Sequence, residues 1–128
     1  MKKFFIILGF GLMVLVVILN TGCKSKSDYD ITGPWVITIY IEDGEASNTY
    51  IFTGNKNEGT VTIENIPSNG NYTVDGDTVQ FSVSYGITAP LSSENFTGRF
   101  ENEGFMQGNF NITFEGEITD TGTWQGVR

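Results

Sequence analysis

The side chains of this 128-residue chain that could take part in chemistry are carboxylates, tyrosine hydroxyls and one thiol, Cys23. Because the sequence contains no histidine, its serines lack the usual general base, and the commonest metal-ligating side chain is missing. Asp75 and Asp77 belong to the turn-like sequence VDGD, and no Asp-x-Asp-x-Asp-Gly calcium loop is present. The sequence therefore predicts a protein that is not an enzyme and has no metal site and no cofactor.

The sequence around Cys23 indicates a modification rather than catalysis. Lys2 and Lys3 precede an uncharged and mostly apolar run at 4–19, which is typical of a secretion signal and short for a permanent membrane span. The stretch LNTGC at 19–23 resembles the lipobox of bacterial lipoproteins, in which the cysteine is acylated and becomes the new N-terminus. In that family leucine usually stands three positions before the cysteine, where this chain has Asn20.

The resemblance implies a signal peptide at 1–22, a lipidated Cys23 and a flexible tether at 23–32. It also implies a bacterial cell-envelope protein that is attached to a membrane by its lipid anchor, with Lys24 favouring the outer membrane over the inner one. Two alternatives stay open, an ordinary cleaved signal and an uncleaved anchor in which the thiol is incidental. A lone cysteine forms no internal disulfide, so the hydrophobic core must stabilise the domain.

The chain is acidic, with a formal net charge of −8 that becomes −10 when Lys2 and Lys3 leave with the signal. Phosphate backbones bind to surfaces that are rich in lysine and arginine. We therefore expect no nucleic-acid partner.

The elements that must position these residues are short β-strands. After Trp35, runs rich in Val, Ile, Thr, Tyr and Phe alternate with clusters of Gly, Asn, Asp and Ser, which is typical of antiparallel strands joined by turns. Apolar residues fall on alternate positions throughout, which indicates one buried face and one wet face. Eight strands are expected, at about 35–41, 49–53, 59–64, 71–75, 78–85, 95–101, 105–114 and 122–128.

No helix is expected to cover the apolar face, so the sheet must bury it by folding over into a sandwich or by closing on itself. Each large side chain contributes roughly 1.5 to 3 kcal/mol when it is fully buried, which makes closure strongly favourable. Eight strands with short connections favour an all-β, antiparallel up-and-down barrel over residues 33–128. Such a barrel is just wide enough for side chains or one small ligand.

Closure of the barrel would place the start of the first strand beside the end of the last strand. Trp35 should then lie next to Arg128, whose guanidinium could stack on the indole. This arrangement resembles the lipocalins, in which a Gly-x-Trp motif on the first strand packs under an arginine near the end of the last one; Gly33, Trp35 and Arg128 match those roles. The alternative is that Trp35 and Trp124 are ordinary core residues and Arg128 a frayed terminus.

The lengths of the connections predict which end is open. In a meander the odd-numbered connections share one end, and here they are long, at 42–48, 65–70, 86–94 and 115–121, whereas the even-numbered ones are short. The long connections are expected to surround a mouth that faces away from the membrane. The inward positions nearest that mouth are candidate ligand-lining residues: Ile41, Tyr50, Ile63, Tyr72, Tyr85, Phe96 and Phe114.

The rim of the predicted mouth carries acidic side chains and no lysine or arginine. Such a rim would attract a cationic ligand or a basic protein surface, although acidic turns can also serve only to keep a protein soluble. The acidic rim consists of Glu42, Asp43, Glu45, Glu115, Glu117 and Asp120, with Glu64 and Glu94 at its edges.

These residues predict a membrane-anchored, lipocalin-like barrel that binds a small, mainly apolar ligand at its open end. Two alternatives stay open. The first is an interaction or inhibitor module whose acidic loops bind a basic protein, similar to the lipid-anchored lysozyme inhibitors of bacteria, many of which carry a cysteine pair that this chain lacks. The second is a purely structural barrel that its own bulky side chains plug.

Overall fold

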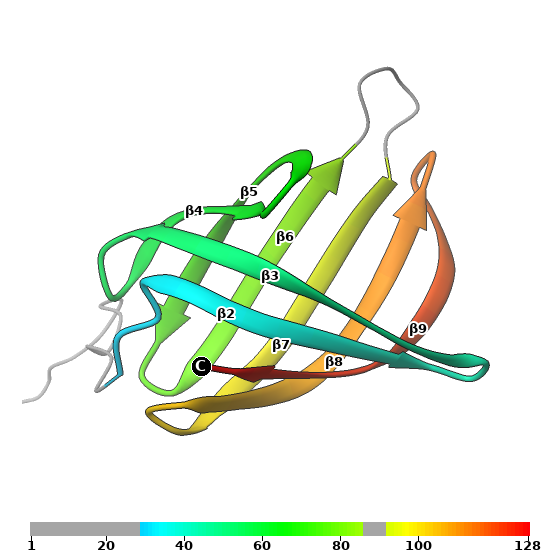
Figure 1. The fold of residues 1–128 in the computed structure, drawn as a ribbon. Coiled ribbons are helices and arrows are strands. Elements are labelled where there is room, and N and C mark those ends of the chain that lie inside the picture. The colour runs from blue at the N-terminus through cyan, green and yellow to red at the C-terminus, as the bar shows by residue number, and fades with distance from the viewer. Residues whose placement is uncertain (1–28, 86–91) are drawn as a thin grey trace, which may run out of the picture.

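The computed structural model describes residues 29–85 and 92–128, which form a closed barrel of eight antiparallel strands (Figure 1). Each strand pairs with its neighbours in sequence, as expected of an up-and-down meander. The expected signal peptide at 1–22, Cys23 and residues 24–28 lie outside the described residues. The strands are β2 (Gly33–Ile41), β3 (Gly44–Gly54), β4 (Glu58–Ile63), β5 (Ile66–Asp75), β6 (Thr78–Tyr85), β7 (Ser92–Asn102), β8 (Phe105–Phe114) and β9 (Glu117–Val127).

The alternation of apolar and polar residues places one face of every strand inside the barrel. The core contains Trp35, Phe52, Phe81, Phe96 and Trp124, among others, and the outer face is mainly Thr, Ser, Asn and Gln. Most of the aromatic rings meet edge to face, which is the arrangement that their quadrupoles favour. In the described part of the chain, no helix is long and apolar enough to cross a bilayer.

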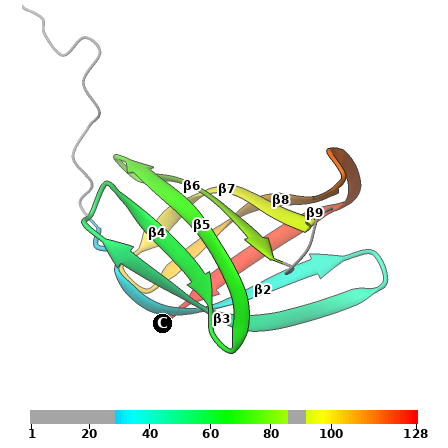
Figure 2. The ribbon, with the colours of Figure 1, turned by 90° about the horizontal axis from the view of Figure 1, so that it is seen from above.

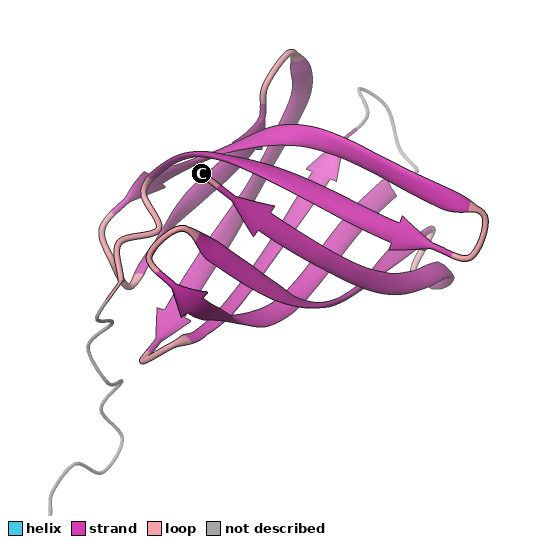
Figure 3. Cartoon of the chain, turned by 60° about the horizontal axis from the view of Figure 1, so that its bottom comes forward, coloured by secondary structure: helices cyan, strands magenta, loops and turns pink. Residues whose placement is uncertain are grey.

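The first and last strands close the barrel, as the sequence predicts. β2 pairs antiparallel with β9, with Ile37 opposite Gly126 and Ile39 opposite Trp124. Figure 1 and Figure 3 show the two strands side by side, with the C-terminus ending near the start of β2. The apolar face is therefore enclosed without a covering helix.

Glycines on the inner face let the strands bend and leave room for the large rings. At Gly98, an added Cβ would lie 2.2 Å from the carbonyl oxygen of Gln107 and 2.8 Å from the indole of Trp124. No side chain larger than hydrogen fits there, so the glycine allows the close backbone approach and the curvature that closure of a small barrel requires.

The prediction of long connections at one end of the barrel is wrong. β3, β5 and β9 begin several residues earlier than predicted, so the connections there shrink to two residues each, at 42–43, 64–65 and 115–116. The sequences that the analysis treated as loops pair through their backbones, which polar residues permit as readily as apolar ones. The fourth connection, 86–91, lies outside the described residues, and loop length no longer identifies the mouth.

Candidate functional site

One end of the barrel is sealed by Arg128 and Trp35. The guanidinium carbon of Arg128 lies 4.5 Å from the centroid of the Trp35 ring, a cation–π contact. Its Nη1 donates to the carbonyl of Thr32 at 2.8 Å, and its Nη2 donates to the carbonyl of Asp30. The indole N–H of Trp35 donates to the carbonyl of Ile31 at 2.7 Å, so this buried donor has a hydrogen-bond partner in the segment that seals the same end.

Gly33 and the segment before it complete this closed end. Gly33 adopts a φ of 107°, which favours glycine, and its Cα faces the guanidinium of Arg128. Ile31 is buried, and the ring of Tyr29 stacks on Phe100 at 4.8 Å. The structure therefore brings together the three residues of the predicted closure motif, and it packs 29–32, the end of the expected tether, against the core.

The opposite end is open, because the inner face becomes exposed towards it. Along β2, Trp35 is 1% exposed and Ile41 is 36% exposed, although both lie on the same face. Along β8 the exposed fraction rises from 0% at Met106 to 42% at Phe114, and on β3 the inward residue that precedes buried Tyr50 by two positions is exposed. This end is the mouth, and its walls are inner-face residues that solvent reaches.

Two hairpins frame the mouth. β3 pairs with β4 only from Tyr50 to Gly54, and β9 pairs with β2 only from Thr123 onward. The outer parts of the β2–β3 and β8–β9 hairpins, here called the hairpin ribbons, therefore each have one free edge, at residues 44–48 of β3 and 117–121 of β9. Figure 2 shows the β2–β3 hairpin extending beyond its neighbours. The inner faces of the ribbons remain accessible because no further strand covers them.

The predicted ligand-lining residues fall into three groups. Tyr50, Ile63 and Phe96 are buried, and Tyr50 and Phe96 are in edge-to-face contact at 5.8 Å. Tyr85 is half-buried. The remaining residues differ in position: Ile41 and Phe114 are exposed on the inner face at the mouth, whereas Tyr72 is not at the mouth.

Ile41 and Phe114 are exposed at the tips of the two frame hairpins. Tyr72 lies towards the closed end, where its hydroxyl donates to the carbonyl of Asn55 at 2.6 Å. The sequence pattern predicts Tyr72 at the mouth, because the apolar alternation indicates a strand that begins at 71. Since β5 begins at Ile66, Tyr72 stands beyond the middle of the strand.

The polar group that the sequence analysis missed is Glu94. It was placed on a loop at the edge of the acidic rim, but it belongs to β7, points inward and is only 6% exposed. It lies opposite Val83 on β6 and Ile112 on β8. The alternation of the strand could have predicted the inward position of Glu94, because it lies two residues before buried Phe96 and alternate residues face the same side.

Two tyrosines hold the Glu94 carboxylate. The hydroxyl of Tyr50 donates to Oε1, and the hydroxyl of Tyr85 donates to Oε2 at 3.3 Å. Burial raises the pKa of Glu94 above its ordinary value, and the two hydrogen bonds offset part of that rise. Burial and the nearby carboxylate raise the pKa of Tyr85 to about 12 and that of Tyr50 further still, so both tyrosines are neutral donors at neutral pH.

The described cations lie at one end of the barrel, whereas acidic residues lie at both ends. The cations of the described residues all belong to the closed end: Lys56 in the turn at 55–57, Arg99 at 3.5 Å from Asp77, and Arg128. The predicted acidic rim lies on and beside the turns at the mouth and is exposed at every position: Glu42, Asp43, Glu45, Glu115, Glu117 and Asp120. The field at the mouth is therefore negative.

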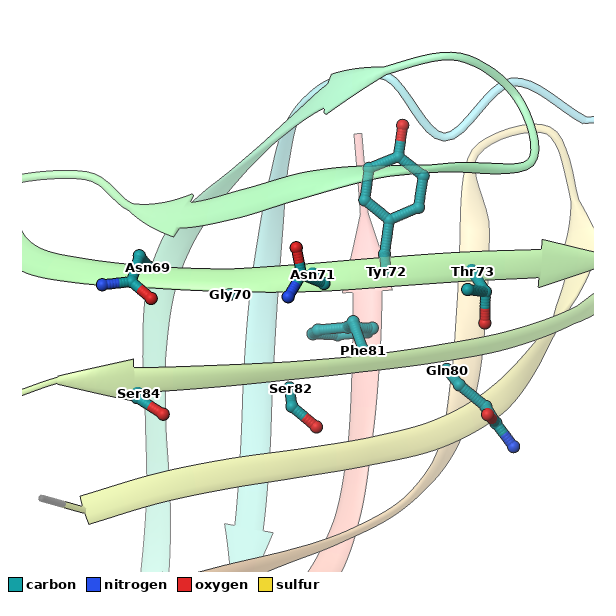
Figure 4. Close-up of a pocket in the computed structure, with 9 residues that line it drawn as sticks. All are labelled: Asn69, Gly70, Asn71, Tyr72, Thr73, Gln80, Phe81, Ser82 and Ser84. Atoms are coloured by element: carbon teal, nitrogen blue, oxygen red, sulfur yellow. The ribbon is translucent and has the colours of Figure 1, made fainter.

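The outer face of the barrel carries shallow, polar hollows that are distinct from the mouth. One hollow, of about 350 Å³, lies over β5 and β6 (Figure 4). Much of its lining consists of facing pairs from the two strands, Asn69 with Ser84 and Asn71 with Ser82. Another hollow, over β7, β8 and β9, is lined mainly by asparagine and threonine. Most of the residues that line these two hollows are polar, whereas most small-molecule sites are lined mainly by apolar side chains.

The fold and its open end define a small, closed, antiparallel β-barrel, and the comparisons with known proteins agree on this class. No protein-family model and no curated protein matches the sequence. The solved structure of EF1p2_mFAP2b bound to DFHBI is 17% identical with a TM-score of 0.59, over 77% of this chain and 93% of that one. The redesigned beta barrel mFAP1 bound to DFHBI is 18% identical with a TM-score of 0.56, over 77% and 94%. At such identities the likeness establishes the fold.

Proposed function

We propose that this barrel is a non-catalytic binding module whose open end takes a small, mainly apolar ligand. The observation that carries the proposal is the change in exposure along the inner face, which is fully buried at the closed end and accessible at the mouth. The ligand would rest on the half-buried side chains of Tyr85 and Ile112, with the exposed inner-face residues Ile41 and Phe114 beside it. The two similar barrels are both described as bound to DFHBI, which supports a fold that accommodates a ligand.

A blocking variant tests this site. Ala46 is an exposed residue on the inner face of β3 at the mouth, and Ser47 is its exposed neighbour on the outer face. The wild-type protein should gain thermal stability with members of a panel of hydrophobic small molecules, and a ligand at 100 times its Kd adds about 2.7 kcal/mol. Ala46→Trp should abolish that gain and Ser47→Trp should retain it. An equal gain in both variants, or no gain with any compound, would refute the proposal.

We further propose that the protein is a lipocalin-like lipoprotein of the bacterial cell envelope, anchored through Cys23 in the outer membrane rather than the inner one. The segment from Tyr29 to Thr32 enters the barrel at its closed end, which supports an orientation with the mouth away from the membrane. Metabolic labelling with palmitate tests the anchor. The label should be lost in Cys23→Ser and kept in Lys24→Ser, and a labelled Cys23→Ser protein would contradict it.

A second candidate function is the binding of a basic protein at the same end. The observation that favours it is the exposed acidic rim, which no described lysine or arginine neutralises. A complex driven by this rim should weaken sharply between low and high salt, because screening acts on exposed charges. Pull-down with a basic envelope-attacking enzyme such as lysozyme at two ionic strengths distinguishes this function, since a ligand held by apolar contacts would be insensitive to salt.

A further inference from the structure

Glu94 is the one carboxylate among the buried residues of the described chain, and the proposed ligand site contains it. Each of its oxygens accepts one hydrogen bond from a tyrosine. An ionised carboxylate offers about four acceptor positions, so acceptor capacity remains on both oxygens. The described cations Lys56, Arg99 and Arg128 belong to the closed end, and none of them compensates the charge of Glu94.

A buried carboxylate destabilises this part of the core. Its neighbours across the sheet are the apolar residues Val83 and Ile112, and burial of a charge without a cationic partner is unfavourable. Glutamine would fill the same space without a charge, accepting one tyrosine hydrogen bond at its carbonyl oxygen and donating its amide N–H to the oxygen of the other tyrosine. The two tyrosines orient the carboxylate rather than neutralise it, which is the arrangement expected when the partner of the charge is supplied from outside.

Glu94 can be approached from the mouth. Ser92, the next inward position of β7 towards the mouth, is partly exposed, and its partner Phe114 is exposed. Tyr85 and Ile112, which flank the carboxylate, are half-buried. The path to the carboxylate therefore runs between partly accessible inner-face residues and past the acidic rim, whose field attracts cations.

We propose that the ligand of this site is an organic cation, in which a protonated nitrogen on a flat apolar body donates a hydrogen bond to Glu94. This inference rests on the proposed binding function and specifies the class of ligand. The apolar body would pack on the half-buried side chains of Tyr85 and Ile112, and the charged nitrogen would supply the positive charge that the described residues do not. Charge-assisted hydrogen bonds are about twice as strong as neutral ones, so Glu94 would determine which ligands bind.

Three naphthalene probes of matched shape test the inference: 2-naphthylmethylamine, 2-naphthylmethanol and 2-naphthoate. Calorimetric titration of the mature protein should show the amine binding at least about tenfold more tightly than the alcohol, with no binding of the carboxylate. Glu94→Gln should remove the preference for the amine and leave the affinity for the alcohol within about twofold. Glu101→Gln, which removes an exposed carboxylate at the closed end, is the control for net charge and should retain the preference.

A second variant covers the case in which Glu94→Gln disturbs the fold. Tyr85→Phe removes the longer of the two hydrogen bonds to Glu94 and frees acceptor capacity on Oε2, so the amine should bind as tightly as to the wild type or more tightly. Equal affinity for amine and alcohol in the wild type overturns the inference and leaves the proposed function standing. Failure of all three probes to bind overturns both.

Discussion

At the closed end of the barrel, Arg128 connects three parts of the chain. Its guanidinium stacks on Trp35 of β2, its nitrogens donate to carbonyls of the segment before β2, and its own backbone N–H donates to Gly104 at 3.3 Å. An exposed arginine side chain is ordinarily free to move. Here the contacts fix it, because the indole face and the carbonyl oxygens both favour a planar cation.

The first prediction is that Trp35 and Arg128 are energetically coupled. Arg128→Ala should lower the free energy of unfolding by about 1 kcal/mol, since it removes a cation–π contact and two hydrogen bonds that solvent partly screens. In a double-mutant cycle with Trp35→Leu, measured by urea unfolding, the two losses should differ from additivity by about 0.5 kcal/mol or more. Lys56→Ala paired with Trp35→Leu is the control and should be additive; equal additivity in both cycles would contradict the contact.

The second prediction concerns Glu94 and pH. Since burial raises its pKa in the folded state above the ordinary value of 4.5, the folded state binds the proton more tightly than the unfolded state does. The stability linked to this group is therefore greatest below pH 4.5 and falls as the pH rises towards the pKa of the folded state. Thermal unfolding of Glu94→Gln should lack this fall, so the variant should gain on the wild type as the pH increases.

The control for this pH dependence is Glu101→Gln, because Glu101 is an exposed carboxylate on the outer face of β7. The stability of this variant should depend on pH as that of the wild type does. If Glu94→Gln left the dependence of stability on pH unchanged, the pKa of Glu94 would not differ between the folded and unfolded states.

Single residues also show what the sequence could and could not predict. Gly33, Trp35 and Arg128 could be predicted to meet, because a closed meander leaves no other neighbour for the first strand. The residue type of Glu94 did not predict its burial, since glutamate is rarely buried. Its position two residues before Phe96 indicated an inward side chain, but the serines before it favoured a loop. Its tyrosine partners lie on other strands, which residue type alone does not pair.

Among the elements, all eight strands were predicted, but β3, β5, β7 and β9 begin earlier than their composition suggests. The missing part of β3 is Gly-Glu-Ala-Ser-Asn, which has no β-branched or aromatic residue. It is extended because β2 supplies backbone partners from Gly44 to Asn48, an effect of register that a single-strand pattern does not contain. The position of the mouth depended on the same misjudged segments, and burial identified it instead.

The third prediction concerns the β8–β9 turn. Glu115 has a φ of 55° and Gly116 a φ of 83°, the left-handed pair that a two-residue hairpin turn of type I′ requires. Glutamate is unfavourable in that conformation, whereas asparagine tolerates it and Asn-Gly is the preferred sequence. Glu115→Asn should therefore raise the free energy of unfolding by about 0.5 to 1 kcal/mol in urea titrations.

The matched control for this turn is Glu117→Asn, which removes the same charge at the first residue of β9 and should not stabilise the protein. If both variants gained equally, relief of charge repulsion at the rim would explain the effect, and the turn conformation would not.

At the scale of the whole molecule, closure combines packing with a polarity along the barrel. The pairing of β2 with β9 joins residues as far apart as Ile37 and Gly126, so its loop-closure entropy is offset only when the core between them is assembled. The apolar pattern predicted this enclosure, because every strand has a buried face. The acidic rim without lysine or arginine was also predicted from the sequence, whereas the change in exposure along the inner face followed only from the lengths and pairing of the strands in the structure.

The fourth prediction is that local stability decreases from the closed end to the mouth. Backbone amides in the β2–β9 seam, such as those of Ile37 and Gln125, lie between strands that pair on both sides and pack on buried rings. In the hairpin ribbons, residues 44–48 and 117–121 have a partner strand on one side only and exposed side chains. Native-state hydrogen exchange should therefore show global protection in the seam and fast exchange from local opening in both ribbons.

Ligand binding provides an internal control for the expected difference in hydrogen exchange between the seam and the ribbons. A ligand held between the ribbons should slow exchange at 44–48 and 117–121 while leaving the seam unchanged, since the seam already opens only by global unfolding. Uniform protection across the unliganded barrel would mean that the ribbons are not locally unstable. The mouth would then be a rigid rim, and a ligand would bind there without local opening of the two hairpins.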